Sequence, residues 1–260
     1  MIKNAAVVLA GLISFCFVDS SAMAKQITGR ETVEVEVPVK ALLAPSVGYE
    51  ERNNVEVVLY GTLPNTCYTL GRYEVERANQ TLRVHQFAYR QIGGVCADES
   101  KVPLPLHLKM IVPFTNEVFA GSLPAGDYKF TFLEEGGTLG SRDLTVAPNQ
   151  VPMGDTFPYA SLSNAHAPDL VSSNDEIHVV LSGVLNSTCT KLNPDIRVVN
   201  DSDVFIVMPT ITVRQGVVCT AVLTPFEVTV NLGKTFPGIH LIHARSMNGK
   251  AVSRVVQVLP

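Results

Sequence analysis

Residues 55–63, Val-Glu-Val-Val-Leu-Tyr-Gly-Thr-Leu, return in a second version at residues 177–185, Ile-His-Val-Val-Leu-Ser-Gly-Val-Leu. A cysteine follows each copy at the same distance, at Cys67 and Cys189, and these two cysteines lie 122 positions apart. Matches that recur in the same order at a fixed spacing indicate an internal repeat.

Further landmarks extend the repeat over most of the chain. The matched pairs are Arg90-Gln91 with Arg214-Gln215, Pro105-Leu106 with Pro225-Phe226, Pro124-x-Gly126 with Pro237-Gly238, and Ser141-Arg142 with Ser253-Arg254. A repeat of about 120 residues is a normal size for one domain with its own core. We therefore expect a first domain at 25–148, a linker at 149–154 and a second domain at 155–260.

The hydrophobic pattern within each repeat has a period of two, which is typical of half-buried strands. Val33, Val35, Val37 and Val39 alternate with polar residues or Pro38, and the proline places this strand at a sheet edge. The pattern predicts further strands at 55–60, 68–76, 81–90, 104–112, 127–133 and 141–147, and at 177–182, 195–200, 204–213, 225–232, 238–245 and 251–259. The predicted fold is all-β, with two tandem antiparallel β-sandwich domains.

Residues 1–24 have the features of a secretory signal peptide. Lys3 precedes an apolar stretch that ends before Ala22-Met23-Ala24, a small-x-small cleavage site. The stretch is shorter than the ~20 residues that span a bilayer. Phe15 is too bulky to precede a lipid-modified Cys16, so we expect no lipid anchor and no transmembrane segment in the mature chain. These features predict a secreted or periplasmic protein in an oxidising compartment.

Four cysteines remain in the predicted mature chain: Cys67, Cys96, Cys189 and Cys219. Four cysteines allow three pairings. The repeat favours Cys67–Cys96 and Cys189–Cys219, because this choice gives each domain the same closed loop. The wide spacing argues against a zinc site or a redox pair, since both usually have Cys-x-x-Cys.

The chain resembles bacterial secreted proteins built from tandem immunoglobulin-like sandwich domains. The resemblance covers nearly the whole mature region and depends on Gly-x-Leu-x-x-x-Cys-x-x-Leu, which starts at Gly61 and Gly183, and on the second cysteine of each repeat. Antibody-type domains differ, because they pack a tryptophan on a disulfide that joins the sheets, and this chain has no tryptophan. Each first cysteine follows a turn-like segment. We therefore expect the bridges at strand ends or in loops.

Composition and motifs argue against several function classes. With 20 basic and 24 acidic residues the chain has a net charge of −4, which does not favour nucleic-acid binding. The sequence has no Gly-x-Ser-x-Gly elbow, phosphate-binding glycine loop or His-Glu-x-x-His. We expect no cofactor, no metal and no catalytic residue, although a dispersed catalytic site stays open as an alternative.

The cluster Asn200-Asp201-Ser202-Asp203 is the densest group of oxygen ligands in the chain. Calcium prefers such ligands, but the further spaced ligands of a calcium loop are missing. The matching segment of the first repeat is Ala78-Asn79-Gln80. We interpret the cluster as a solvated hairpin turn, with a calcium site as the alternative.

One spacing differs between the repeats. Pro105 and Gly126 lie 21 positions apart, whereas Pro225 and Gly238 lie 13 apart. This predicts about eight extra residues near 111–120, with Pro113, Phe114 and Phe119 as candidate partner contacts. Two alternatives are an extended hairpin that buries its own aromatic side chains, and strand addition at Val33–Val39.

These observations predict a non-catalytic secreted or periplasmic module that acts through contacts with a protein partner at the cell envelope. A secreted protease inhibitor that presents the 111–120 loop is one alternative. An envelope enzyme with an unrecognised site is the other.

Overall fold

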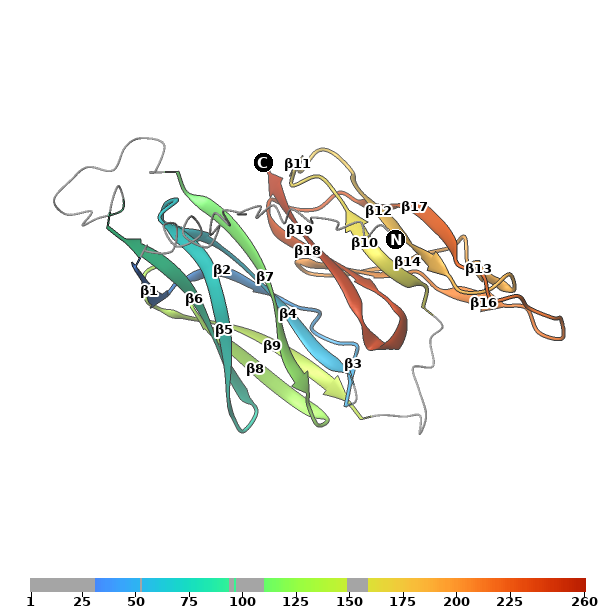
Figure 1. The fold of residues 1–260 in the computed structure, drawn as a ribbon, viewed down its shortest axis with the longest axis horizontal. Coiled ribbons are helices and arrows are strands. Elements are labelled where there is room, and N and C mark those ends of the chain that lie inside the picture. Colours follow the sequence, from blue (N-terminus) through green and yellow to red (C-terminus); the bar gives the residue numbers. More distant parts are fainter. Residues whose placement is uncertain (1–30, 52, 94–95, 97–109, 149–158) are drawn as a thin grey trace, which may run out of the picture.

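The structure is a computed structural model that describes residues 31–51, 53–93, 96, 110–148 and 159–260. The predicted signal peptide and the predicted linker at 149–154 lie outside the described residues. Within these ranges every long element is a β-strand, and no sheet combines strands from before and after residues 149–158. We call residues 31–148 the N-terminal half and residues 159–260 the C-terminal half (Figure 1). Among the described residues no helix is long and apolar enough to cross a membrane.

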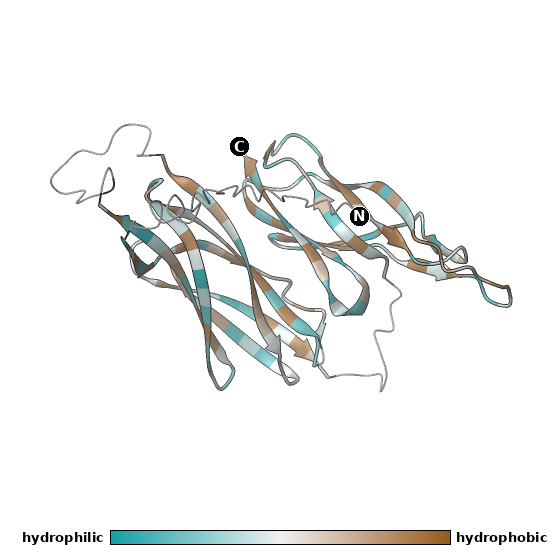
Figure 2. Ribbon diagram, in the orientation of Figure 1, coloured by the Kyte–Doolittle hydropathy of each residue, from teal (hydrophilic) through white to brown (hydrophobic). Residues whose placement is uncertain are grey.

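The N-terminal half consists of two sheets. One has the order β1-β6-β8-β9-β3, with β5 also paired to β6, and the other has the order β2-β4-β7. The strands are β1 (Glu31–Glu36), β2 (Val39–Leu43), β3 (Tyr49–Glu50), β4 (Asn54–Leu63), β5 (Tyr68–Ala78), β6 (Thr81–Ile92), β7 (Val112–Ser122), β8 (Gly126–Leu133) and β9 (Leu139–Ala147). Apolar residues alternate with polar ones along most strands, as the coloured ribbon shows (Figure 2), and a core fills the space between the sheets.

The C-terminal half has the sheets β10-β12-β17 and β11-β19-β18-β15-β14, and the pair β13-β16. Its strands are β10 (Ser161–His166), β11 (Leu170–Ser172), β12 (Ile177–Leu185), β13 (Thr190–Leu192), β14 (Arg197–Asp201), β15 (Val204–Met208), β16 (Ile211–Val213), β17 (Thr224–Gly233), β18 (Gly238–Arg245) and β19 (Ala251–Leu259). A 3-10 turn, Met247–Gly249, joins the last two strands. A second core lies between these sheets.

Strand pairing follows the same scheme in both halves. In the N-terminal half β4 pairs antiparallel with β7, and β6 pairs parallel with β8. In the C-terminal half β12 pairs antiparallel with β17, and β15 pairs parallel with β18. A short parallel pair completes each scheme, β3 with β9 and β11 with β19.

The predicted strand at Val33–Val39 divides between two sheets. Residues Glu31–Glu36 pair with β6, and the chain then crosses at Pro38 so that β2 pairs with β4. A proline has no N–H to donate to a ladder, and it lies here between the two paired segments. Both β1 and β2 lie at the ends of their sheets, as expected from Pro38.

Two disulfides close the corresponding hairpins. Cys67 is bonded to Cys96, with Cα atoms 5.7 Å apart, and Cys189 to Cys219, with Cα atoms 5.5 Å apart. In each case the first cysteine directly precedes a strand, β5 or β13, and its carbonyl accepts a backbone hydrogen bond of 2.9 Å from the returning strand. The bridges therefore lie at strand ends.

The expected insertion near residues 111–120 is wrong. The expected strand at 104–112 reaches the described residues only at 110–112, of which Val112 alone is in a strand, as the first residue of β7. Residues Val112–Ser122 form β7, which pairs with β4 from Asn54 to Leu63. Pro113 and Phe114 lie opposite Thr62 and Gly61, just as Pro225 and Phe226 lie opposite Val184 and Gly183.

Pro113-Phe114 is thus the equivalent of Pro225-Phe226. The match of Pro105 with Pro225 that the sequence indicated is replaced by this one. With this match each proline lies 13 positions before Gly126 or Gly238, so no residues are inserted between them. The extra residues lie between Cys96 and Pro113, which are 17 positions apart, whereas Cys219 and Pro225 are 6 apart.

Packing on glycine explains this register. A Cβ atom at Gly61 would lie 2.5 Å from the Phe114 ring, and one at Gly183 would lie 2.9 Å from the Phe226 ring. At Gly183 the backbone oxygen of Ser161 is closer still. Each phenylalanine therefore fits only because its cross-strand neighbour has no side chain.

We expect Gly183→Ala to lower the free energy of unfolding by about 2–3 kcal/mol, because a methyl group there overlaps a backbone atom of β10 that is fixed by pairing. Gly61→Ala should cost about 1–2 kcal/mol, since mainly a side-chain ring must move. Urea unfolding measures both, with Ser182→Ala on the same strand as the control. A Gly183→Ala protein as stable as the control would contradict the close packing.

Candidate functional site

The two halves meet through an apolar contact between the outer faces of two sheets. Leu43 of β2 and Val58 of β4 pack against Val204 and Ile206 of β15 and Leu241 of β18, and all five side chains are buried. This contact buries β4 on both faces, because Val55, Val57 and Leu59 point into the N-terminal core. We call this contact the junction.

Ion pairs and hydrogen bonds border the junction on the side of the β14–β15 turn. The Asp201 carboxylate accepts hydrogen bonds from the backbone N–H of Ser46 at 2.6 Å and from its hydroxyl at 3.0 Å. Arg142 of β9 pairs with Asp203 at 2.6 Å and donates to the carbonyl of Ala44 at 2.6 Å. Because hydrogen bonds and ion pairs are directional, they fix how the two halves are oriented at the junction in addition to holding them together.

The segment Asn200–Asp203 is therefore a hairpin turn, as interpreted from the sequence, but both of its carboxylates bind the N-terminal half. Ser202 has φ of 60°, the left-handed turn conformation also adopted by Asn79 in the β5–β6 turn. Within the described ranges, no group of three or more His, Cys, Asp or Glu side chains is placed to hold a metal ion.

A second set of hydrogen bonds lies at the junction around Glu56, whose side chain is buried, with 8% of the residue exposed. The Ser253 hydroxyl of β19 donates to Glu56 Oε1 at 2.8 Å, and the Tyr49 hydroxyl donates to the Glu56 carbonyl at 2.7 Å. Burial raises the pKa of Glu56 to about 7, against the opposing effect of the Ser253 hydrogen bond, and the Glu117 carboxylate raises it further. Burial of this carboxylate opposes folding once it is ionised.

His243 of β18 adjoins this group. Its Nδ1 lies 3.4 Å from the Ser253 hydroxyl oxygen, and its ring meets Tyr49 edge-on at 6.4 Å. Burial, with a smaller contribution from Arg245, lowers the pKa of His243 to about 3, so the imidazole is neutral at neutral pH.

Serine, histidine and glutamate thus lie together, but their order differs from that of a hydrolase triad. In a triad the histidine lies between the serine and the acid, takes the serine proton and is oriented by the acid. Here Ser253 lies between the other two and donates to the carboxylate. This arrangement links the two halves and does not activate the hydroxyl for attack.

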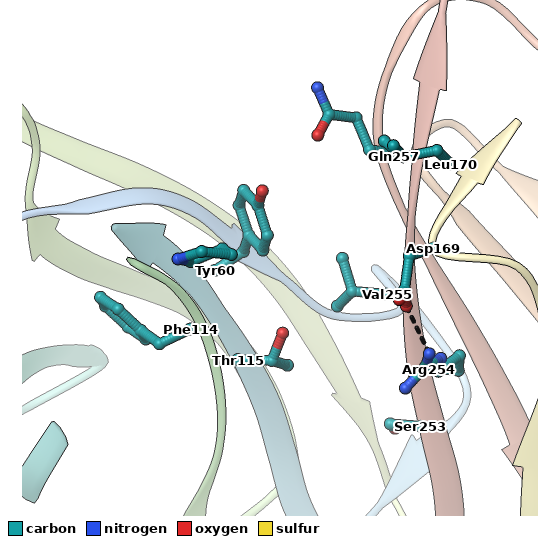
Figure 3. A pocket seen from close by; sticks show the side chains of 10 residues that line it. Tyr60, Phe114, Thr115, Asp169, Leu170, Ser253, Arg254, Val255 and Gln257 are labelled. Atoms are coloured by element: carbon teal, nitrogen blue, oxygen red, sulfur yellow. Dashed lines mark hydrogen bonds and ion pairs between the residues drawn. The ribbon is translucent and has the colours of Figure 1, made fainter. Parts of the chain in front are cut away.

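A groove of about 430 Å³ opens beside Ser253, between the two halves. One wall consists of Tyr60 and β7, and the other of β19 together with Asp169 and Leu170. Tyr60 and Thr115 point toward the β19 wall, where Val255 and Gln257 face them, and Arg254 pairs with Asp169 at the rim (Figure 3). The groove therefore combines apolar surface with several hydrogen-bonding side chains.

The predicted contact residues on β7 divide between its two faces. Phe114 is 7% exposed, and its ring turns into the N-terminal core, away from the groove (Figure 3). Phe119 is 46% exposed, and Pro113 is also exposed. We call the exposed outer face of β7 the β7 stripe; its residues are Pro113, Thr115, Glu117 and Phe119.

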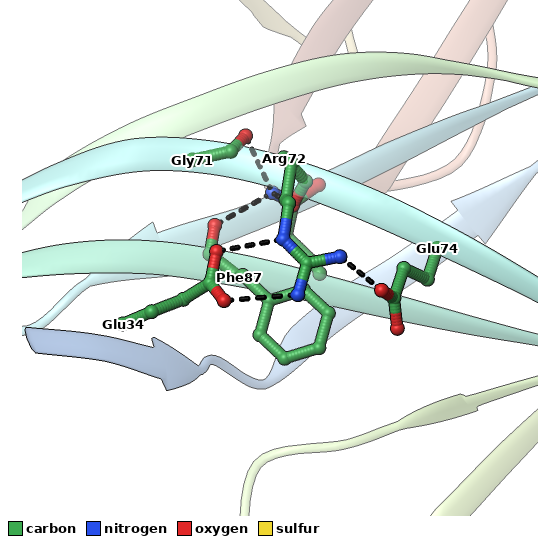
Figure 4. A network of polar contacts seen from close by, with 6 residues as sticks. Glu34, Gly71, Arg72, Glu74 and Phe87 are labelled. Atoms are coloured by element: carbon green, nitrogen blue, oxygen red, sulfur yellow. Dashed lines mark hydrogen bonds and ion pairs between the residues drawn. The ribbon is translucent and has the colours of Figure 1, made fainter.

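The outer face of β1, β6 and β5 has a different character. The Arg72 guanidinium lies 4.5 Å from the centroid of the Phe87 ring and bridges Glu34 and Glu74, with bonds of 2.8 and 2.9 Å to Glu34 (Figure 4). This hydrogen bonding lowers the pKa of Glu34. Glutamates of β1 are thus engaged across β6, and this face is charged rather than apolar.

Sequence reasoning missed the residues of the junction and the β19 wall. From the sequence, Ser253 and Arg254 were noted only because they match Ser141-Arg142 in the other repeat, and Glu56 only because it is part of a repeated strand. A signal existed for Asp201 and Asp203, since the matching segment Ala78-Asn79-Gln80 has no acid. A carboxylate pair present in one repeat and absent from the other indicates a contact that only one repeat makes.

Comparison with known proteins extends over the C-terminal half. A family model of the ORF11 beta-sandwich domain matches residues 179–258, from β12 to β19. No curated protein and no solved structure matches the chain. The similarity supports a β-sandwich protein, in agreement with the sheets described above.

The raised pKa of Glu56 predicts a pH-dependent stability. The native protein binds this proton more tightly than the unfolded chain, whose carboxyl has a pKa near 4.5, so the stabilisation is complete below pH 4.5 and is lost as the pH rises through 7. Glu56→Gln keeps an acceptor for Ser253 and cannot ionise. We expect it to raise the free energy of unfolding by about 2–3 kcal/mol at pH 8 and by little at pH 4.5.

Urea unfolding at both pH values measures this difference, and Glu227→Gln on the exposed face of β17 is the control. An effect of Glu56→Gln that is the same at both pH values would show that its carboxylate is not held in an unfavourable environment.

Proposed function

We propose that this chain is a non-catalytic, secreted or periplasmic binding module of bacterial origin, which binds an extended segment of a protein partner at the cell envelope along β7 and the adjoining groove. The observation that carries the proposal is the position of β7. This strand lies at the end of its sheet, and its exposed stripe borders a groove whose walls come from both halves.

An unpaired sheet edge is a template for another strand. In the described part of the chain β7 pairs with β4 alone, and a hydrogen bond of 3.4 Å from the Phe119 N–H to the Tyr73 hydroxyl occupies one group of the strand. A partner segment added at such an edge gains main-chain hydrogen bonds, and pockets for alternate side chains give it specificity.

The groove supplies such a pocket. Its wall residues include the aromatic ring of Tyr60, the aliphatic Val255 and the polar Thr115 and Gln257. A volume of about 430 Å³ accommodates a few side chains of an extended peptide. We therefore propose that the partner segment has an apolar side chain at every second position, so that these side chains enter the groove.

The junction supports binding because it holds the two walls at a fixed separation. Binding costs less when the site is already in its bound shape. The buried cluster around Val58 and Leu241 and the pair of Arg142 with Asp203 provide this rigidity without the predicted linker.

The finer description of the fold is also a proposal. We interpret the two halves as tandem immunoglobulin-like domains that arose by duplication, supported by the common pairing scheme, the equivalent disulfides and the Gly-Phe contacts. The leader at 1–24 and the disulfides support secretion. The inhibitor alternative loses its premise, because residues 112–122 form a paired strand instead of a presented loop.

The test is a photo-crosslinking residue placed at Thr115 or Phe119 in the protein expressed in its native envelope, followed by mapping of the crosslinked peptide. We expect crosslinks to one partner segment. Thr115→Lys with Phe119→Lys should reduce capture of that partner at least tenfold, because the charges cover the stripe without entering the core.

The matched control is Glu227→Lys with Thr229→Lys, on the exposed face of β17, which pairs with β12 as β7 pairs with β4. Equal loss of capture in both double variants would refute a specific role for β7.

A further inference from the structure

The end of the C-terminal half farthest from the junction is an exposed apolar loop. Residues 214–223, which we call the tip loop, connect β16 to β17 and form the orange segment at the right of Figure 1. Val218 is 99% exposed and Leu223 is 71% exposed; Val217 and Val222 of the loop, and Val213 at the adjoining end of β16, are about half exposed. Apolar side chains this exposed and this close together usually mark a binding surface.

The tip loop is held in place by covalent and hydrogen bonds. Cys219 is bonded to Cys189, directly beside Val218. The Thr188 N–H donates to the Thr220 carbonyl at 3.1 Å, and the Thr220 N–H donates to the Thr188 hydroxyl at 3.1 Å. These bonds fix the middle of the loop, directly beside the fully exposed Val218.

A basic recess lies beside the apolar loop. Thr188, Cys189, Lys191, Thr212 and Arg214 line a hollow of about 460 Å³. Arg214 is the one charged residue in the stretch 211–225, and Lys191 is the one charged residue in 186–194. Residues 186–194 and 211–225, which form the tip loop and the recess, thus carry two positive charges and no negative charge in a protein of net charge −4.

We infer that the tip loop and its basic recess dock on the surface of an anionic phospholipid bilayer. Exposed aliphatic side chains enter the boundary between headgroups and acyl chains, and neighbouring cations attract acidic lipids. Lys191 and Arg214, with the hydroxyls of Thr188 and Thr212, provide the donors that a phosphate headgroup accepts. The loop is convex, so it suits insertion into a soft surface.

This binding goes beyond the proposed partner contact and uses different residues. The β7 stripe and the groove belong to the junction region, whereas the tip loop is at the opposite end of the C-terminal half (Figure 1). The two sites are therefore free to act together, with the tip at the bilayer and the groove accessible to a partner.

The test is cosedimentation of the disulfide-bonded protein, lacking residues 1–24, with vesicles of phosphatidylcholine alone or with a third of phosphatidylglycerol. We expect binding to the anionic vesicles that weakens with added salt. Lys191→Gln with Arg214→Gln should lower the partition coefficient about fivefold for each charge removed. Val218→Asp with Leu223→Asp should abolish binding.

Two control variants match these changes elsewhere on the surface. Leu139→Asp alters an apolar residue that is 57% exposed on β9, and Arg83→Gln with Lys129→Gln removes two exposed charges of the N-terminal half. We expect the apolar control to bind like the parent protein and the charge control to lose less than twofold. Circular dichroism and the mass of the disulfide-linked peptide establish that each variant is folded.

Failure of the parent protein to bind anionic vesicles would overturn the inference. Equal binding to both vesicle types, or equal losses in tip and control variants, would also overturn it. A tip that is needed to capture a protein, but not to bind vesicles, would identify a protein surface in place of a lipid surface. Thr115→Lys with Phe119→Lys should leave vesicle binding unchanged, so this proposal and the proposed function fail separately.

Discussion

The contact between the outer faces of β4 and of the β15–β18 pair determines the shape of this protein. In a two-sheet sandwich one face of a sheet covers the core and the other faces water, but β4 is covered on both faces, because Val57 packs in the N-terminal core and Val58 packs at the junction. The two halves therefore behave as one body with three apolar layers. The groove lies next to this contact, because Val255 both packs against the junction cluster and lines the groove opposite Tyr60.

Much of the fold could be predicted from the sequence because half-buried strands have a strong local signal. The strands expected at 127–133, 238–245 and 251–259 agree with β8, β18 and β19 to within a residue. The error at 111–120 has a physical origin: Pro105 and Pro113 are each followed by an apolar residue, so local sequence cannot say which one opens the strand. The choice depends on Gly61, which lies about 50 positions away and leaves room for the Phe114 ring.

The candidate site was less predictable than the fold. Selecting Pro113, Phe114 and Phe119 as a group ignored the alternation that a strand imposes, which sends Phe114 inward and the other two outward. The β19 wall and the junction depend on contacts such as Ser46 with Asp201, 155 positions apart, and no local pattern contains that information. The sequence indicates such a contact only where the two repeats differ, as at the β14–β15 turn, which has two carboxylates where the β5–β6 turn has none.

Polar groups at the junction have a structural role that valines alone do not supply. An apolar contact between two sheet faces is nondirectional, so it fixes the distance between the halves more firmly than their relative rotation. Asp201 with Ser46 on one side, and Glu56 with Ser253 on the other, bind only in one register. Ser253 is also part of the groove wall, so the hydrogen bond that partly offsets the burial of the Glu56 carboxylate also positions that wall.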